Sequence, residues 1–475
     1  MTENRAIIIG AGPAGPTATI ELRRRSGIKP IVIAAAAVRL ALLVVSLART
    51  GTSGLITPDT SSYLEPGRNL LLHGRFVADG APDLLRTPGY PLFFAITSLG
   101  GMATTALANV ILSVFSVVLV WRLARTVFGD DRTALLAAWI FAFEPTSVAN
   151  SVSLASDTLF LALFLLSMER LAEFLRRHCL RALAMAGLWL AAATLVRPVT
   201  YYLPVALAAG LFLVLVRVPD GLRWKALAVL LISVLPWIAA WQLRNWVETG
   251  YRGFSSITEV NLYFANAALV TARVDHRSFV DVRREFGYPD GKNYSEQAYL
   301  YEPYLAQHPE QAQWGQGQRL AFMHSAASRI IRAHYGTYLR VSFIALFKTM
   351  FSPGTGSFDH LLHPENSNHL DSLIAYAGPA EGALALAKAY PWIAAEKAAF
   401  VSVSLGLYLL ALRGAFRGGM HSACLWLLLG TSVYFLAVTG IAAGPSGSAR
   451  YRLPVMPIVC ILAAAGVRRT RKIEQ

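Results

Sequence analysis

The sequence predicts an all-α protein that crosses a membrane many times, and three observations lead to this fold class. Hydrophobic residues make up 55% of the 475-residue chain and charged residues only 15%, with a mean hydropathy of +0.46. A water-soluble protein of this size carries a larger share of charged residues. The apolar residues also form runs close to the length that spans a bilayer. Finally, basic residues gather between these runs, which is typical of membrane proteins.

Ten apolar segments meet or approach the length of a membrane span, which is about 17 to 25 residues. They are residues 30–48, 104–123, 133–149, 153–171, 182–196, 202–216, 224–243, 394–412, 423–441 and 453–467. Two further stretches, 89–99 and 337–351, are short or interrupted by Arg340 and Lys348. We expect these to form helices at the membrane surface. The prediction is therefore about ten transmembrane helices, within a range of ten to thirteen, plus juxtamembrane helices.

The basic residues predict the orientation of the chain, because short cytoplasmic loops carry an excess of Lys and Arg. They gather in five places, namely 122–132, 170–181, 217–225, 413–417 and 468–472, whereas the turn at 144–151 has none. We therefore interpret the net charge of +15 as a topology signal rather than a nucleic-acid surface. The expected regions are a cytoplasmic segment 1–29, a transmembrane module 30–243 with a first outer loop 49–103, an outer loop region 244–393, C-terminal spans 394–467 and a cytoplasmic tail 468–475.

The first residues contain GAGPAG, the glycine spacing of a dinucleotide-binding loop. A strand over 6–9, a helix over 16–25 and a second strand over 29–33 would give the stretch its usual context, similar to the first unit of FAD-dependent oxidoreductases. However, no acidic residue occurs between Glu21 and Asp59 to hold a ribose, and a membrane span follows at once. We interpret the segment as a vestigial fragment and expect no flavin or NAD. A membrane-tethered flavoprotein is the alternative.

Polar residues at the expected outer ends of the spans are the strongest functional signal, because ionisable groups near a bilayer are costly and are usually functional. The first outer loop contains TPDTSSY, with Asp59 and Tyr63, and then RTPGYP, with Arg86 and Tyr90. The turn between the third and fourth spans reads FEPTSVANSVSLASD, which begins beside Glu144 and ends at Asp157. All of these side chains are expected on one side of the membrane.

Together with an R-P pair at Arg197, an R-N pair at Arg244 and a late ARYRLPVMP, these motifs resemble the GT-C glycosyltransferases. The most similar branch uses polyprenyl-phosphate sugars and includes protein O-mannosyltransferase-like and lipid A aminoarabinose transferase-like enzymes. The resemblance runs from about Val38 to Val467. It implies transfer of a sugar from a lipid phosphate to an acceptor hydroxyl at the outer face of a bacterial cytoplasmic membrane, with inversion of the anomeric centre.

The resemblance also implies roles for individual residues. Asp59 is the candidate general base, with a helix N-cap as the alternative. Asp157 is a second catalytic candidate that would orient the acceptor or, with Asp59, bind a divalent cation such as Mg or Mn; its alternative is also a cap. Arginine suits phosphate recognition, although arginines at span ends often only reach the headgroups. The expected substrate-binding set is Tyr63, Arg86, Tyr90, Glu144, Arg197, Arg244, Asn245, Arg450, Tyr451 and Arg452.

The expected partners are a polyprenyl-phosphate-sugar donor, a glycan, lipid or protein acceptor, and the bilayer itself. The choice between a hexose such as mannose and a pentose such as arabinose stays open. A transporter or flippase is the alternative function, since it would also be basic and polytopic. Transporters commonly contain internal repeats, and none is visible in this chain.

Overall fold

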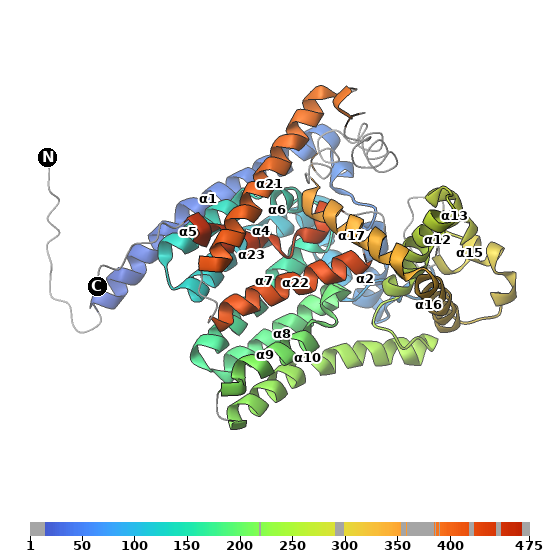
Figure 1. The fold of residues 1–475 in the computed structure, drawn as a ribbon, viewed down its shortest axis with the longest axis horizontal. Coiled ribbons are helices and arrows are strands. Elements are labelled where there is room, and N and C mark those ends of the chain that lie inside the picture. Colours follow the sequence, from blue (N-terminus) through green and yellow to red (C-terminus); the bar gives the residue numbers. More distant parts are fainter. Residues whose placement is uncertain are drawn as a thin grey trace.

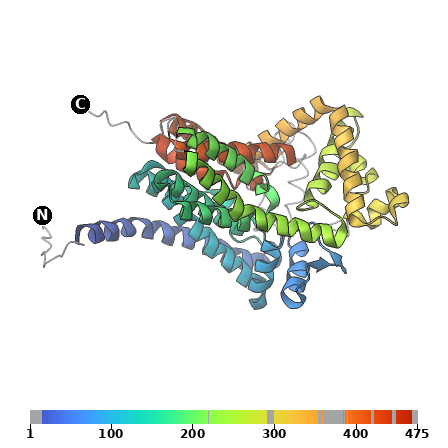
Figure 2. The same cartoon turned by 90° about the horizontal axis from the view of Figure 1, so that it is seen from below.

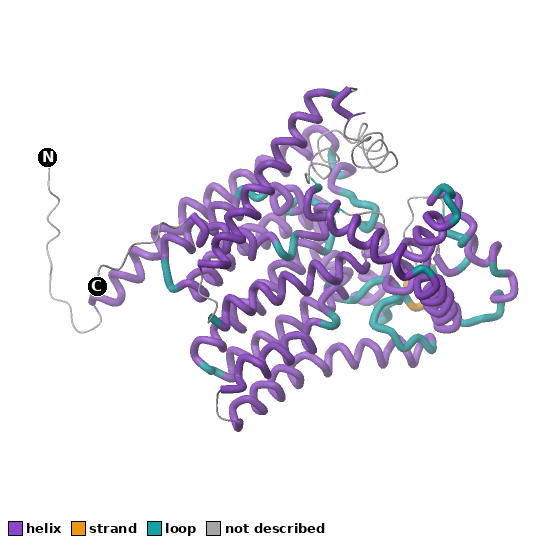
Figure 3. Tube along the Cα trace, in the orientation of Figure 1, coloured by secondary structure: helices purple, strands orange, loops and turns teal. Residues whose placement is uncertain are grey.

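The computed structural model describes residues 15–217, 220–289, 299–352, 390–417, 422–442 and 448–467, together with positions 358, 384 and 386–388. Nearly all of this part of the chain is helical, with one short pair of strands (Figure 3). The all-α prediction is therefore confirmed. The GAGPAG glycines at positions 10 and 12 lie outside the described residues.

A bundle of long helices forms the body of the molecule, and a lobe of short helices lies at one end of it (Figures 1 and 2). The bundle contains α1 (Gly15–Thr50), α4 (Met102–Phe128), α5 (Asp131–Ala142), α7 (Asp157–Arg177), α8 (Leu180–Val196), α9 (Leu203–Val214), α10 (Asp220–Thr249), α21 (Pro391–Arg417), α22 (Ala423–Ala442) and α23 (Met456–Val467). The 3₁₀ turns η3 (Pro198–Thr200) and η4 (Leu215–Arg217) flank α9.

Five helices in the described ranges are long and apolar enough to cross a membrane, and they lie at Gly27–Thr50, Met102–Phe128, Gly221–Thr249, Pro391–Arg417 and Ala423–Ile441. Three shorter apolar helices, Leu180–Val196, Pro198–Val214 and Met456–Val467, fall on three more of the expected spans. The chain is thus a multi-pass membrane protein. The expected number of ten spans stays a prediction.

Helix α1 differs from the expectation at the start of the chain. It runs without interruption from Gly15 to Thr50, so the strand expected over 29–33 is wrong. The residues after position 33 are an alanine run, and alanine is the strongest helix former. Because the helix continues through Pro30 into the apolar segment, the second strand of a nucleotide-binding unit does not form here.

The turn between the third and fourth expected spans is also more broken than predicted. The span expected over 133–149 is wrong as one helix, because α5 ends at Ala142 and α6 (Pro145–Asn150) begins after Glu144. Proline suits the first turn of a helix, where its missing N–H is not needed. The buried guanidinium of Arg39 in α1 supports this corner by donating to the Ala142 carbonyl at 2.8 Å and to Ser147 Oγ at 3.3 Å.

Shorter elements lie between the bundle helices in the sequence. They are η1 (Ser53–Leu55), α2 (Ser61–His73), the antiparallel strands β1 (Val77–Ala78) and β2 (Ala81–Pro82), α3 (Gly89–Thr97), η2 (Ser98–Gly100) and η8 (Ala449–Arg452). The lobe consists of α11 (Ile257–Asn261), the π-helical turn η5 (Leu262–Ala267), α12 (Ala268–Val274), α13 (Phe279–Glu285), α15 (Glu302–Gln307), η6 (Pro309–Gln311) and α16 (Gln316–Ala333), followed by α17 (Tyr335–Phe351).

Close helix contacts fix the C-terminal part of the bundle. Helices α21 and α23 pack along each other, and two glycines allow the approach. A Cβ atom placed on Gly414 would lie 1.8 Å from the Leu462 carbonyl oxygen, and one on Gly466 would lie 2.0 Å from that of Leu410. Small residues let membrane helices approach this closely. The crossing sets the position of α23 and therefore of η8, which precedes it.

Candidate active site

The carboxylate of Asp59 lies between two arginines that are far apart in the sequence. Its Oδ1 accepts a hydrogen bond from Arg86 Nη2 at 2.8 Å, and its Oδ2 accepts one from Arg450 Nη1 at 2.6 Å. Asp59 precedes α2, but the N-cap residue of that helix is Thr60 and no side chain caps it. The carboxylate therefore forms an ion-pair network instead of capping the helix.

Asp157 is the second carboxylate of this network. It is the first residue of α7, whose N-cap residue Ser156 makes no capping hydrogen bond. Its Oδ2 accepts from Arg450 Nε at 2.7 Å, and its Oδ1 accepts from Arg197 Nη1. Arg450 thus donates to both carboxylates and joins the start of α2 to the start of α7. We refer to Asp59, Arg86, Asp157, Arg197 and Arg450 as the ion-pair network.

Aromatic and hydroxyl side chains surround the Arg86 guanidinium. Arg86 Nε donates to Ser62 Oγ at 2.8 Å, and its guanidinium carbon lies 4.7 Å from the centre of the Tyr63 ring. The Tyr63 hydroxyl lies 3.4 Å from Ser156 Oγ. The buried Tyr90 ring packs edge-on against Tyr63, with 4.7 Å between the ring centres. These contacts hold Tyr63 and Arg86 together beside Asp59.

The electrostatics of the network favour an anionic ligand. Burial alone would raise the pKa of Asp59, but the guanidinium groups of Arg86 and Arg450 outweigh it and hold that pKa well below its usual range. The pKa of Arg197 falls to about 10, chiefly through burial and then through the charge of Arg450. Three guanidinium groups thus face two carboxylates. The network has one excess positive charge.

Four of the other expected site residues make structural contacts in this arrangement. Arg244 donates to the main-chain carbonyls of Asp83, at 2.8 Å, and Phe76, and Asn245 donates to those of Gly253 and Phe254, both at 3.1 Å. Arg452 donates to the carbonyls of Met350 and Ser352, and Glu144 accepts from the backbone N–H groups of Thr146 and Ser147. The Tyr451 residue is 37% exposed.

Sequence reasoning missed three residues that contact the network or the Tyr63 side chain beside it. Ser62 and Ser156 supply hydroxyl groups to Arg86 and Tyr63. Phe160 lies under the Arg197 guanidinium, with 5.8 Å between its ring centre and the guanidinium carbon. The sequence could have indicated them through their distance from the predicted site residues, since Ser62 precedes Tyr63 and Phe160 follows Asp157 by about one helical turn.

The carboxylates do not fit a divalent cation in this arrangement. Each oxygen of Asp59 and of Asp157 already accepts a hydrogen bond from an arginine. A cation bound between them would face three guanidinium charges, whereas magnesium and manganese sites need oxygen ligands with negative charge. In the part of the chain that the structure describes, no group of three or more His, Cys, Asp or Glu residues is placed to hold a metal.

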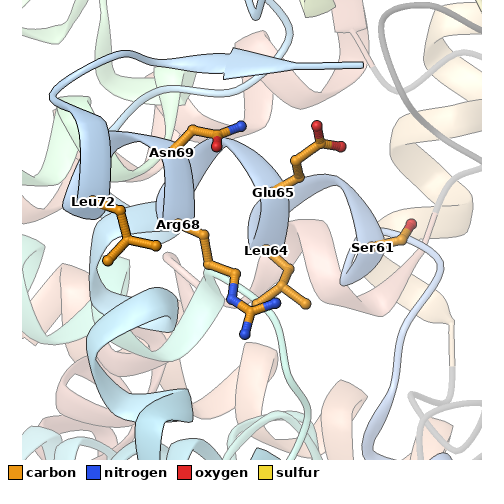
Figure 4. A pocket seen from close by; sticks show the side chains of 6 residues that line it. All are labelled: Ser61, Leu64, Glu65, Arg68, Asn69 and Leu72. Carbon is orange, nitrogen blue, oxygen red and sulfur yellow. The ribbon is translucent and has the colours of Figure 1, made fainter. Parts of the chain in front are cut away.

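A groove runs along α2, starting two residues after Asp59. It has a volume of about 460 Å³ and is lined by Ser61, Leu64, Glu65, Arg68, Asn69 and Leu72 (Figure 4). On the hairpin side, Glu65 accepts from the Asp79 N–H and Asn69 donates to the Val77 carbonyl, both at 2.9 Å. These two hydrogen bonds hold the Glu65 and Asn69 side chains, which belong to the lining of the groove.

Comparison with solved structures finds membrane glycosyltransferases at low sequence identity. The chain is similar to the archaeal oligosaccharyltransferase AglB from Archaeoglobus fulgidus, solved with an inhibitory peptide and a dolichol-phosphate (15% identity, TM-score 0.44, covering 91% of this chain and 50% of that one). The apo form of the Archaeoglobus fulgidus oligosaccharyltransferase gives 13% identity, a TM-score of 0.47 and coverage of 90% and 50%. The chain spans about half the length of these archaeal proteins.

A further similar structure is ArnT from Cupriavidus metallidurans bound to undecaprenyl phosphate, with 16% identity, a TM-score of 0.35 and coverage of 92% and 77%. No curated protein shows a significant match to the chain. Residues 90–241 match the family model described as dolichyl-phosphate-mannose-protein mannosyltransferase. This segment, which includes Asp157 and Arg197, is thus similar to that family over about a third of the chain.

Proposed function

We propose that this protein transfers a sugar from a polyprenyl-phosphate donor to an acceptor hydroxyl, with inversion at the anomeric carbon. The ion-pair network is the observation that carries the proposal, because it combines a carboxylate that can accept a proton with arginines that can bind a phosphate. The family match over residues 90–241 supports the choice of a lipid-phosphate donor.

The excess positive charge suits the leaving group of such a reaction. When the bond between the anomeric carbon and the phosphate oxygen breaks, its electron pair stays on the phosphate and adds negative charge there. Arginine binds phosphate oxygens through paired N–H groups, and donors already in place stabilise the developing charge without having to reorient. Arg86 and Arg450 have the guanidinium groups closest to Asp59.

Asp59 would act as the general base. The acceptor oxygen attacks the anomeric carbon from the face opposite the phosphate, and its proton passes to a carboxylate oxygen. With both arginines bound, Asp59 is a weak base, since its pKa is held well below its usual range. A bound phosphate would compete for Arg86 and Arg450, which would raise the pKa of Asp59 at the moment when a base is needed. Donor binding and base activation are therefore linked.

Asp157 would hold Arg197 and Arg450 in place, because its two oxygens accept one hydrogen bond from each. No step of this mechanism requires a metal ion. We propose that the reaction takes place at the periplasmic or outer face of a bacterial cytoplasmic membrane, because the charge pattern of the loops favours that side for the site.

The test uses purified protein in lipid nanodiscs with radiolabelled undecaprenyl-phosphate mannose and undecaprenyl-phosphate arabinose. Each donor is incubated with a cell-envelope extract as the source of acceptors, and labelled product is separated from donor. Wild-type protein should form product from one of the two donors. Asp59→Asn should lower the rate by about 100-fold or more, because loss of a general base typically costs 10²–10⁴.

Asp281→Asn is the matched control, since Asp281 is an exposed carboxylate in the lobe whose ion pair with Arg284 is 3.5 Å long. It should behave like the wild-type protein. Product formation by Asp59→Asn at the wild-type rate would overturn the assigned base. Movement of the donor across the bilayer without any glycosylated product would instead identify a flippase.

A further inference from the structure

Arg86 reaches Asp59 from a loop rather than from a helix, so something must fix the loop. It lies between β2, which ends at Pro82, and α3, which begins at Gly89. Yet the Arg86 side chain is only 13% exposed and meets Asp59, Ser62 and Tyr63 with specific geometry. Loops generally vary more than the elements that they connect. The contacts made by residues 82–85 explain why this loop holds Arg86 in one position.

Asp83 holds the loop from inside. Its side chain is buried, with the residue 4% exposed. The Oδ1 atom accepts hydrogen bonds from the backbone N–H groups of Leu85, at 2.7 Å, and of Arg86, at 3.1 Å. This is the local turn that aspartate favours when its carboxylate bonds its own backbone two residues on. It sets the direction in which the Arg86 side chain leaves the main chain.

Arg244 holds the same loop from the end of α10. Its Nη1 donates to the Asp83 carbonyl at 2.8 Å, and its Nη2 donates to the Phe76 carbonyl in the residue before β1. Its guanidinium carbon also lies 5.1 Å from the ring centre of Trp241 and 5.6 Å from that of Phe76. One guanidinium thus joins both ends of the hairpin to α10 across 161 and 168 positions of sequence.

The segment leading into the lobe completes the clamp. Ser255 Oγ donates to the Leu85 carbonyl at 2.7 Å, and the Ser256 N–H donates to the Leu84 carbonyl at 2.8 Å. The side chains of Leu84 and Leu85 are buried in the hydrophobic core of the lobe. The carbonyl groups of Leu84 and Leu85 are therefore hydrogen-bonded to residues that follow α10 in the sequence.

We propose that Asp83 and Arg244 are positioning residues for phosphate binding: together they hold the main chain of residues 83–86 so that the Arg86 guanidinium stays on the network. Asp83 contacts Arg86 at its main-chain N–H, and Arg244 contacts the main-chain carbonyl of Asp83. The role rests on the proposed function, because it assigns the purpose of fixing Arg86 to recognition of the lipid phosphate. It also reassigns Arg244, which the sequence favoured as a phosphate ligand.

The probe is undecaprenyl phosphate, and undecaprenol, which lacks the phosphate, is the reference lipid. Binding of each to the full-length protein in nanodiscs is measured by displacement of radiolabelled undecaprenyl phosphate. Asp83→Ala and Arg244→Gln should each weaken binding of the phosphate by about tenfold, as expected when one charged contact is poorly placed. Asp83→Asn should recover most of the affinity, because its amide oxygen can still accept the two N–H groups.

Arg277→Gln is the matched control for Arg244→Gln, since Arg277 forms an exposed ion pair with Glu285 in the lobe. It should bind undecaprenyl phosphate like the wild-type protein. If Asp83→Ala does not fold, the amide hydrogens of Leu85 and Arg86 in Arg244→Gln give the second readout. They should exchange faster with solvent than in Arg277→Gln, because the loop has lost its outer anchor.

A double-mutant cycle with Arg86→Gln distinguishes positioning from general stability. If Arg244 acts through Arg86, Arg244→Gln weakens binding about tenfold in the wild-type background and hardly at all in the Arg86→Gln background. Equal weakening in both backgrounds, or unchanged affinity in Arg244→Gln, overturns the inference. If the wild-type protein binds undecaprenol as tightly as undecaprenyl phosphate, the proposed function is overturned. This measurement uses only the wild-type protein, so its outcome can be told apart from that of the double-mutant cycle.

Discussion

Replacing Asp83 by asparagine should make the protein more stable at neutral pH. Burial raises the pKa of the Asp83 carboxyl to about 6, even though the N–H groups of Leu85 and Arg86 and the charges of Arg86 and Arg244 act in the opposite direction. Asparagine resembles the protonated carboxyl and removes the cost of keeping a charge in this buried loop.

The magnitude follows from the difference between the folded and unfolded pKa values. The free carboxyl titrates at 3.8 and the folded one at about 6, which corresponds to about 3 kcal/mol. Because the folded state binds the proton more tightly, the contribution of about 3 kcal/mol to the free energy of unfolding is fully present below pH 3.8 and is lost as the pH rises through 6. Roughly half of the 3 kcal/mol is lost between pH 5 and pH 7.5.

Thermal unfolding in detergent, followed at several values between pH 5 and pH 7.5, measures the effect. Asp83→Asn should have a Tm several degrees above the wild-type value at pH 7.5, and the gain should shrink to about half at pH 5. Comparing the two proteins cancels other titrating groups such as Glu259, whose pKa is also raised by burial. Asp59 contributes nothing to the slope here, because its lowered pKa keeps it ionised throughout.

A wild-type protein and an Asp83→Asn variant with the same pH dependence of Tm would refute this reasoning. The variant should also keep most of its affinity for undecaprenyl phosphate, because its amide oxygen can still accept from the N–H groups of Leu85 and Arg86.

Three further predictions concern the network and the bundle. Arg450→Gln should lower sugar transfer by about 100-fold or more, and Arg450→Lys should recover little, because one ammonium nitrogen cannot reproduce the two separate donors, Nε and Nη1, through which Arg450 reaches Asp157 and Asp59. Steady-state rates measure both, and full activity in Arg450→Lys would contradict the bridging role. Transfer should persist in excess EDTA, whereas a loss that magnesium restores would show that a cation binds after all. Gly466→Leu should force α21 and α23 apart and lower the Tm by several degrees, since a Cβ atom there already meets the Leu410 carbonyl oxygen at 2.0 Å; an unchanged Tm would argue against the close crossing.

The membrane fold could be predicted from the sequence because it depends on properties that act along the chain. Run length and composition decide whether a helix is apolar enough to cross a bilayer. The wrong predictions concern where individual helices begin and end. One helix ends at Ala142 and another begins at Pro145 inside a run that looked continuous. Helix α1 runs through residues 29–33, where a strand was expected.

The site was only partly predictable, since position at a span end does not reveal what a side chain contacts. Arg244 and Arg450 look equivalent in the sequence, yet Arg450 contacts two carboxylates and Arg244 contacts two main-chain carbonyls. The difference comes from elements that lie far away in the sequence, such as the hairpin that reaches Arg244. Asp83 was missed because a buried aspartate in a loop has no pattern of its own.

The bridge made by Arg450 means that the site can assemble only after η8 has been synthesised. Its partner Asp59 lies 391 positions earlier, so every helix between them is synthesised before the two can meet. Until η8 arrives, Arg86 and Arg197 only balance the charges of Asp59 and Asp157, and no positive charge is left over for a phosphate. Since domains fold from the N-terminus during synthesis, the proposed phosphate site would be incomplete until η8 has been made and has reached Asp59 and Asp157.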